Sequence, residues 1–373
     1  MFGRLGCDDK KWGLVSLGEF CLLNPQKSEL HNISDDTEVS FLPMSSVSEN
    51  GELTLSERKL YRDVKSGFSY FADGDVLFAK ITPCMENGKG AVAHGLCNNI
   101  GFGSTEFHVL RVKTSVCNPY WLYELLSLKQ FRKIAEQNMT GSAGQKRVPA
   151  EFLQNFKLSL PPIELQNEYV SISRQIDKSK FLLQKILEKL ELLKKSRFVE
   201  MFGDPILESK NLKISSLLSD FCDLKAGDFT SAKDISESET EETPYPCFGG
   251  NGIRGYVDNY TKEGIFPIIG RQGALCGNVN LSFGKFRNTE HAVLVTPKNQ
   301  MNTVWLFKKL ELLNLNRLSI GAAQPGLSVG NLNKIPFTVP SIEEQNKYAE
   351  IYKQLDKSKL VIQKSLEDLV GKS

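Results

Sequence analysis

The sequence predicts an α+β protein built from two repeated α/β domains, joined by two long helices that pair along a heptad seam with pseudo-twofold symmetry. Three observations predict this fold: an internal repeat, a heptad pattern in two charged tails, and short β-rich runs between glycine-rich turns ahead of each tail. The expected boundaries are 1–160 for the first domain, 161–203 for the first helix, 204–339 for the second domain and 340–373 for the second helix.

The repeat is clearest in the tails. Residues 176–190 read IDKSKFLLQKILEKL and residues 355–369 read LDKSKLVIQKSLEDL, with nine of fifteen positions identical at an offset of 179. LPPIELQNEY (160–169) matches VPSIEEQNKY (339–348) at the same offset, and STEFHVLRV (104–112) matches NTEHAVLVT (288–296) at an offset of 184. Two copies are too few for a solenoid, so a pseudo-twofold dimer within one chain is expected.

Both tails are expected to be helices that meet along a heptad seam. Apolar residues recur at alternating spacings of three and four, after prolines that permit a helix start and before glycines that favour an end. The first helix is expected from about Glu164 to Phe202. Packing of each helix on its own domain is the alternative. The expected seam, in which Ser179, Ser358 and Ser365 also lie, contains Ile176, Leu183, Ile186, Leu190, Leu355, Ile362 and Leu369.

The domain in front of each tail is expected to be an α+β structure with a curved sheet. GDVLFAKI (74–81), EFHVLRV (106–112), GIFPIIGR (264–271) and HAVLVTP (291–297) have the composition of short strands. YWLYELLSLKQFRKIAEQ (120–137) and VWLFKKLELLNL (304–315) have the pattern of amphipathic helices.

Composition excludes several function classes. The chain has 373 residues and a net charge of +2, whereas a nucleic-acid binder that acts alone is usually more basic, so any DNA role requires local patches or a charged partner. The eight cysteines form no C-x-x-C pair, which argues against a zinc ribbon. The first residues lack the apolar core of a signal peptide, and no run is long enough to span a membrane, so a cytoplasmic protein with inert thiols is expected.

Familiar catalytic motifs are missing or lie in the wrong context. GNGIRG (250–255) matches G-x-G-x-x-G, but CFGG before it does not resemble a buried strand and YVDNYTKEG after it does not resemble a helix. Its glycines fit a loop that offers Asn251 and Arg254 outward. Glu106 and Glu290 coincide in the repeat, which favours a structural or base-reading role over catalysis. No catalytic residue and no metal site are expected.

Polar loops recur at matching places in both halves. Arginine reads guanine, glutamine or asparagine reads adenine, and glycine-rich polar loops suit phosphate contacts. One such loop alone would be weak support, but the recurrence favours DNA contact. The expected DNA-binding residues are Lys80, Thr82, Glu86, Asn87, Lys89, Ser142, Gln145, Lys146, Arg147, Asn251, Arg254, Arg271, Gln272, Gln324 and Ser328.

Seven segments of the chain match a known family of proteins. They are GDVLFAKITPCMENGKGA (74–91), STEFHVLR (104–111), GSAGQKRVPAEFLQNFKLSLPPIELQ (141–166), GGNGIRGYVD (249–258), IGRQGALCGN (269–278), TEHAVLV (289–295) and GAAQPGLSVGNLNKIPFTVPSIEEQ (321–345). Through them the chain resembles the specificity (S) subunit of type I restriction–modification systems. The resemblance covers nearly the whole chain, and motifs of both repeats occur in the family's order.

The resemblance implies a non-catalytic DNA-specificity subunit with two target-recognition domains. In the family each domain reads one half of a split DNA site. The two long helices pair as an antiparallel coiled coil, set the spacing and recruit two modification subunits. Those partners bind S-adenosylmethionine and methylate adenine, and a restriction subunit, where present, uses ATP with Mg²⁺; this chain would hold no cofactor. The two loops differ (LFAKITPCMENGK and IIGRQGALCGN), so an asymmetric bipartite site is expected. A two-domain scaffold for protein or carbohydrate is the alternative.

Overall fold

The computed structural model describes residues 12–142, 144–211, 213–273, 275–319 and 326–370. The chain divides into two compact units, Met1–Lys178 (unit 1) and Ser179–Ser373 (unit 2), and each is described on its own. Within these ranges, no helix combines the length and apolar character needed to cross a membrane.

Unit 1 contains two four-stranded sheets. The first is antiparallel, whereas the second includes the parallel pair β3–β8. In spatial order the first sheet contains β2 (Cys21–Leu23), β9 (Phe107–Val112), β6 (Val76–Ala79) and β7 (Gly90–Val92), and the second contains β4 (Glu57–Leu60), β3 (Glu38–Leu42), β8 (Ile100–Gly103) and β5 (Ser69–Ala72). A separate ladder joins β1 (Leu14–Ser16) to β10 (Lys157–Ser159).

Unit 2 repeats this topology, including the parallel pair at the centre of its second sheet. Its first sheet contains β11 (Cys222–Ala226), β18 (Ala292–Pro297), β15 (Pro267–Gly270) and β16 (Val279–Leu281), and its second contains β13 (Gly252–Val257), β12 (Tyr245–Gly249), β17 (Lys285–Asn288) and β14 (Lys262–Glu263). The Leu217–Pro336 bridge stands where β1 pairs with β10 in unit 1. The internal repeat expected from the sequence is therefore confirmed, with two sheets in each unit where one was expected.

Some helices of the two units occupy equivalent places along the chain, and others occur in one unit. Unit 1 contains α1 (Leu17–Phe20), α2 (Tyr61–Val64), α3 (Pro119–Ser127), α4 (Lys129–Gln137), α5 (Ala150–Asn155), η1 (Lys27–Glu29), η2 (Met44–Ser46) and η3 (Cys97–Asn99). Unit 2 contains α7 (Pro205–Ser209), α8 (Leu218–Phe221), α9 (Thr303–Leu312), α10 (Val329–Asn333), η4 (Ala232–Asp234) and η5 (Leu315–Leu318). The helix expected over 120–137 is two helices, because Leu128 between them has an extended backbone.

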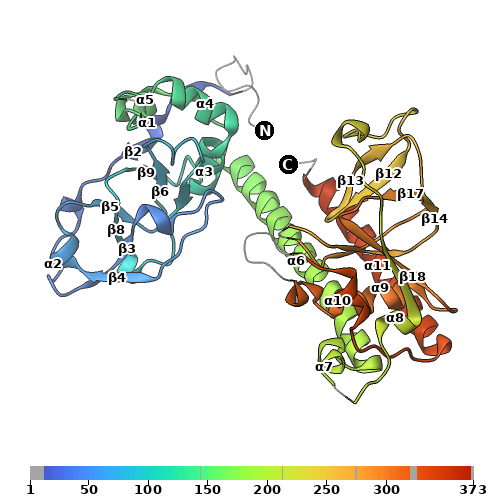
Figure 1. Cartoon of the computed structure of the whole chain (residues 1–373). Coiled ribbons are helices and arrows are strands. Elements are labelled where there is room, and N and C mark those ends of the chain that lie inside the picture. The colour runs from blue at the N-terminus through green and yellow to red at the C-terminus, as the bar shows by residue number, and fades with distance from the viewer. Residues whose placement is uncertain (1–11, 143, 212, 274, 320–325, 371–373) are drawn as a thin grey trace. The chain divides into compact units, whose positions relative to one another are not determined.

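Each unit is layered, with helices on one side of the first sheet and the second sheet on the other. Strand β6 shows how, because alternate side chains of a strand point to opposite faces. Val76 and Phe78 belong to a core shared with α3 and α4, whereas Leu77 and Ala79 belong to a core shared with β3 and β5. A strand buried on both faces reads as a continuous apolar run, which is what 74–81 shows. In Figure 1, α1, α4 and α5 gather at one end of unit 1 and α2 lies at the other.

The two long helices are α6 (Ile163–Phe202) and α11 (Ile342–Val370). A glutamine near the start of each helix holds the N-cap asparagine of a shorter helix. Gln166 accepts from the Asn118 main-chain N–H (2.9 Å), and Gln345 accepts in the same way from Asn302 (2.8 Å). Asn118 and Asn302 cap α3 and α9. The repeated Q-N pair in the sequence is therefore a joint between each long helix and its own domain.

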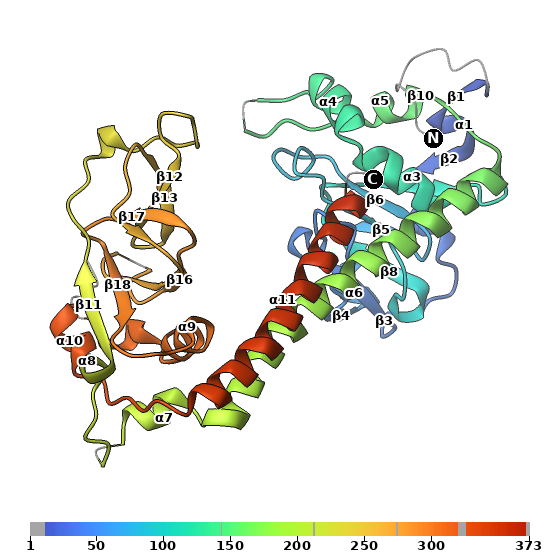
Figure 2. The same cartoon turned by 90° about the vertical axis from the view of Figure 1, so that its right-hand side faces the viewer.

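Within unit 2, α11 runs antiparallel to the part of α6 that belongs to this unit. Lys194 bonds to Asp356 (2.9 Å) and Glu191 bonds to Lys359 (2.8 Å), so residue numbers fall along one helix as they rise along the other. Figure 2 shows the two helices side by side along this stretch. The helix pairing expected from the heptads is confirmed, and so is the antiparallel direction implied by the resemblance.

The buried stripe of α6 follows a different heptad phase from the expected one. Leu183 and Leu190 lie on it, as expected, but Leu187 replaces Ile186, whose side chain is 42% exposed. The prediction that Ile186 lies in the seam was wrong. The sequence pattern does not distinguish the two heptad phases, because both include Leu183 and Leu190 and both carry apolar residues. Ile176 lies in the part of α6 that belongs to unit 1.

On α11 the expected apolar positions lie on the buried stripe. Leu355, Ile362 and Leu369 are all half-buried. The serines expected beside them, Ser358 and Ser365 on α11 and Ser179 on α6, are exposed. Lys359 and Leu366 take the stripe positions next to the α11 serines and are half-buried.

One lysine of the helix pair is almost completely buried. The Lys194 side chain is 1% exposed, and its ammonium donates to Asp356 (2.9 Å) and Glu191 (3.1 Å) and lies 4.6 Å from the Tyr352 ring centroid. Burial alone would lower the pKa of Lys194, but the hydrogen bonds to the two carboxylates outweigh it and raise the pKa. Only the lysine is buried, since the side chains of Asp356 and Glu191 are about half exposed, and the bond to Asp356 joins this turn of α6 to one turn of α11.

The last turns of α6 pack on the core of unit 2. Phe198 is fully buried and contacts Trp305 and Tyr348, with ring centroids 6.4 Å and 5.1 Å away. Gly203 ends the helix with a left-handed backbone (φ 81°), and α7 follows. Glu208 of α7 accepts two hydrogen bonds from Lys309 of α9 (2.8 and 3.0 Å). The segment 194–205 thereby anchors α6 to unit 2.

Candidate nucleic-acid interface

The loop between β6 and β7 in unit 1 is tightly hydrogen-bonded. Main-chain bonds run from Met85 N–H to Ile81 (3.0 Å), from Asn87 N–H to Pro83 (3.0 Å) and from Lys89 N–H to Cys84 (2.9 Å). The Met85 side chain is fully buried beneath it. These contacts hold the polar side chains of the loop on a fixed backbone.

A second loop, 140–148, is bonded to the first. Thr82 N–H donates to Lys146 (3.0 Å) and Val148 N–H donates to Lys80 (2.9 Å), both through main-chain oxygens. This brings four of the predicted DNA-binding residues together: Lys80 and Thr82 from one loop, Lys146 and Arg147 from the other.

Three charged groups meet where these loops leave the sheet. Arg147 donates to both oxygens of the Glu106 carboxylate (2.9 and 2.8 Å). The hydrogen bond from Arg147 lowers the pKa of Glu106 against the opposing effect of partial burial. Burial lowers the pKa of Lys80, with Glu106 opposing that shift. Glu106 therefore positions Arg147, and the carboxylate stays ionised.

His108 fixes the strand beneath this cluster. It is 4% exposed; its Nε2–H donates to Val148 O (2.8 Å), and its Nδ1 accepts from the Asn24 amide (3.3 Å). Both ring nitrogens are satisfied in the neutral form. Burial lowers the pKa of His108, the bond to Val148 opposes this shift, and the nearby Lys80 adds to it.

We expect His108 to make unit 1 less stable as the pH falls from 7 to 5. Because its pKa is lowered on folding, the unfolded chain binds the proton first, so the stabilisation is present above about 6.5 and is lost as the pH drops toward the folded value. His108→Gln should flatten the stability–pH curve in this window, as measured by chemical denaturation at several pH values. His31→Gln, at an exposed histidine of unit 1, is the control and should keep the wild-type slope.

A cavity of about 520 Å³ opens beside the two loops. Its wall includes Thr82, Glu86, Lys133, Glu136, Gln137 and Lys146. Lys133 lies on α4 and was not among the predicted site residues. The basic polar face of α4, KQFRKIAEQ, is the sequence signal that could have identified it.

In unit 2, Arg271 takes the place that Lys80 has in unit 1. Each directly follows the central strand of its first sheet, and its N–H donates across to the neighbouring strand: Lys80 to Glu106 O (2.9 Å) and Arg271 to His291 O (3.0 Å). Arg271 O then accepts from Leu327 N–H (2.8 Å), as Lys80 O accepts from Val148 N–H.

This register aligns Glu106 with His291. The expectation that Glu106 and Glu290 coincide is therefore wrong by one residue, because the strand pairs Ala79–Phe107 and Gly270–Ala292 occupy the same rung of the two sheets. Sequence matching had aligned the two glutamates, but the ladder hydrogen bonds determine which residues correspond.

Three buried polar atoms around Arg271 have no hydrogen-bond partner in the described part of the chain. They are Arg271 Nε, Glu290 Oε2 and His291 Nδ1. Arg271 Nη1 makes one long contact with Glu290 O (3.5 Å), and His291 Nε2 lies 3.1 Å from Glu290 Oε1. Whereas Arg147 of unit 1 is held by a carboxylate, the guanidinium of Arg271 keeps unused donors.

The G-x-G-x-x-G segment is the turn of a β-hairpin. Gly250 and Asn251 connect β12 to β13, so a strand follows the motif rather than a helix, which agrees with the rejection of a dinucleotide site. The expectation that CFGG is not a buried strand was wrong, since Cys247–Gly249 is the buried end of β12. Asn251 and Arg254 are exposed, and Asn251 accepts from Asn278 (3.2 Å), which ties the turn to the β15–β16 loop.

The remaining predicted residues have varied placements. Ser328 caps α10 by accepting from Asn331 N–H (3.1 Å), and Lys89 donates to Met44 O (3.2 Å). Gln272 pairs with Gly326 through a single β-bridge and is exposed. Asn87, Ser142 and Gln145 are exposed. Gln324 lies outside the described residues.

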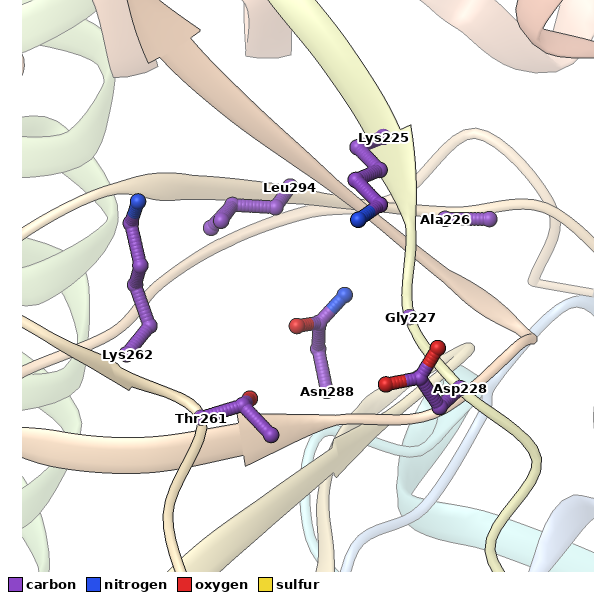
Figure 3. Close-up of a pocket in the computed structure, with 8 residues that line it drawn as sticks. All are labelled: Lys225, Ala226, Gly227, Asp228, Thr261, Lys262, Asn288 and Leu294. Atoms are coloured by element: carbon purple, nitrogen blue, oxygen red, sulfur yellow. The ribbon is translucent and has the colours of Figure 1, made fainter.

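Unit 2 has a cavity of about 170 Å³ whose wall contains none of the predicted DNA-binding residues. Figure 3 shows Lys225, Asp228 and Asn288 around it. The Asn288 amide donates to Ala292 O (3.0 Å) and is thereby fixed in the fold. In the described ranges, no group of three or more histidine, cysteine, aspartate or glutamate side chains could hold a metal ion.

Comparison with known proteins identifies the family of this chain. The sequence-family model of the type I restriction modification DNA specificity domain matches residues 9–192 and 213–370. The chain is 30% identical over 372 residues to the type I restriction enzyme EcoprrI specificity subunit of Escherichia coli, covering 88% of this chain and 90% of that protein. It is 40% identical over 161 residues to the EcoAI specificity subunit of Escherichia coli, a match that covers 43% of this chain and 27% of the relative.

Solved structures share the fold at low sequence identity. One chain from work on complex assembly and conformational transition of the type I restriction–modification system aligns with a TM-score of 0.63 at 20% identity, covering 96% of this chain and 94% of the other. The S subunit from M. genitalium aligns with a TM-score of 0.59 at 17% identity, covering 99% and 96%. With the family model matching both repeats, the chain belongs to the type I restriction–modification DNA specificity family and is a specificity subunit.

Proposed function

We propose that each unit reads one half of an asymmetric, bipartite DNA site. The observation that carries this proposal is the recurrence of one loop arrangement with different chemistry. Lys80 and Arg271 end equivalent strands and share the same main-chain hydrogen bonds, yet Lys80 lies beside a completed Arg147–Glu106 pair and Arg271 lies among unpaired polar atoms. Two loops with the same backbone arrangement but different polar side chains favour recognition of two different base sequences.

The helix pair would set the distance between the half-sites and bind two modification subunits. Beyond the seam, α6 exposes Phe181, Leu182 and Leu192, and α11 exposes Leu360 and Val361, each at least half exposed. Exposed apolar residues in such number favour a protein partner. A net charge of only +2 also favours partners that supply part of the positive surface around DNA.

The chemistry would belong to those partners. We propose that the modification subunits bind S-adenosylmethionine and methylate adenine, and that ATP with Mg²⁺ acts only in a restriction subunit. This chain would serve as the non-catalytic reader of the complex.

Mapping of methylated adenine in host DNA tests the proposal. A host that carries this gene with its modification subunit should show one methylated motif made of two unlike half-sites separated by a constant gap, and the motif should vanish when the gene is deleted. A palindromic or undivided motif would contradict the assignment of one half-site to each unit. Methylation that persists without the gene would contradict the reading role itself.

A further inference from the structure

The carboxylate of Glu86 is only half satisfied. Its Oε1 accepts a hydrogen bond from Thr82 Oγ1 (2.8 Å). Its Oε2 is buried and has no hydrogen-bond partner in the described part of the chain. A buried acceptor without a donor costs free energy, so a donor brought to this oxygen stabilises the complex that contains it.

Two residues bond to Glu86, one through its carboxylate and one through its main chain. Thr82 holds one carboxylate oxygen, and Thr82 N–H is itself bonded to Lys146 O in the second loop (3.0 Å). Arg132 of α4 donates from Nη1 to the main-chain oxygen of Glu86 (3.2 Å). Thr82 therefore fixes one oxygen of the carboxylate, and Arg132 fixes the backbone that carries it.

The surroundings of Glu86 suit a nucleic acid. It lines the cavity of about 520 Å³ together with Lys133 and Lys146, both exposed. The two ammonium groups can neutralise phosphates, which offsets the repulsion between a carboxylate and the DNA backbone. Glu136 also lines this cavity, but it is exposed and is not among the residues with an unpaired buried atom.

A carboxylate discriminates among base edges by charge. In the major groove it accepts from cytosine N4 or adenine N6, and it repels the acceptors of guanine and thymine. We propose that Glu86 reads an exocyclic amino group in the half-site bound by unit 1, a deeper assignment that rests on the proposed function. The corresponding loop of unit 2, RQGALCGN (271–278), contains no acidic residue, so this mode of reading belongs to one half-site only.

Removal of single amino groups from DNA tests this assignment. The full chain, assembled with its modification subunits, is first used to select its site from a library of double-stranded oligonucleotides. Each adenine of that site is then replaced by purine and each cytosine by 2-pyrimidinone, which lack the amino group, and binding is measured for wild type and Glu86→Ala.

We expect one amino group, in one half-site, whose removal weakens wild-type binding about tenfold and leaves Glu86→Ala binding unchanged. The base that carries it identifies cytosine N4 or adenine N6 as the donor. Glu86→Gln retains the size and one acceptor oxygen, so it should show an intermediate loss and also guards against misfolding of the alanine variant. Glu136→Ala, an acid of the same cavity, should keep the wild-type response.

Two results separate failure of the inference from failure of the function. If every amino group that matters to wild type matters equally to Glu86→Ala and Glu86→Gln, Glu86 does not read a base. If the wild-type complex selects no sequence from the library, the result contradicts the proposed function and therefore also the role of Glu86 that rests on it.

Discussion

Leu355→Asp is expected to separate α11 from α6 and to lower the free energy of unfolding of unit 2 by about 2–4 kcal/mol. Leu355 lies on the half-buried stripe, next to Asp356, which bonds to Lys194 of α6. A carboxylate placed there loses part of its hydration, and the two lysines that bridge the helices here, Lys194 and Lys359, already bond to carboxylates.

The same substitution at an exposed position of the same helix supplies the control. Leu360 is 61% exposed, so Leu360→Asp should change the free energy of unfolding by no more than about 0.5 kcal/mol. Chemical denaturation followed by circular dichroism compares the two variants without partners. The methylated motif of a Leu355→Asp host then shows whether the gap between half-sites is lost. Equal stability of both variants together with an unchanged gap would contradict the helix pair as the element that sets the spacing.

Arg271→Ala is expected to abolish recognition at one position of one half-site, with a loss of roughly 10- to 100-fold for the selected base pair. The backbone of Arg271 is fixed on both sides by main-chain bonds to His291 and Leu327. Its Nε has no acceptor in the described residues, so base contact would satisfy a donor that folding leaves unused.

Lys80→Ala is the matched comparison, because Lys80 has the same strand position in unit 1. Binding of each variant to oligonucleotides with randomised half-sites should show that Arg271→Ala relaxes one half-site and Lys80→Ala affects only the other. Uniform weakening of all sequences by Arg271→Ala would assign it to phosphate contact instead. Loss of assembly with the modification subunit would assign it a structural role.

The elements that depend on local pattern could be predicted from the sequence. The β-rich composition between glycine-rich turns marked β6, β9, β15 and β18, and the prolines and glycines around the tails placed the ends of α6 within a residue or so. Periodicity located the helix pair because an apolar stripe must be buried against something. The extra sheet in each unit was not foreseen, since a short strand such as β14 (Lys262–Glu263) carries too few residues to show a pattern.

For the candidate site, the sequence identified the loops that form it but not the contacts between those loops. It placed Lys80, Thr82, Lys146 and Arg147 in two separate loops, and only the fold joins them through the bonds of Thr82 and Val148. It missed Lys133, whose relevance depends on where α4 packs. It also gave Ser328 a possible phosphate contact, although its hydroxyl caps α10.

By itself the sequence determined the duplication, the two long helices and the seam along which they pair, because these follow from periodicity and from residue types that recur at fixed spacing. The antiparallel direction was implied by the family resemblance, since a heptad pattern does not fix helix direction. Only the tertiary structure decided which heptad phase is buried, which residues of the two units correspond, and which polar atoms remain unpaired. Ile186 and Leu187 are equally apolar, so the pairing of Lys194 with Asp356 across the helices settles the phase. Glu106 and Glu86 look alike in the sequence, but a distant arginine completes the first and no described residue completes the second. Such differences arise from contacts between residues far apart in the chain, which local pattern does not encode.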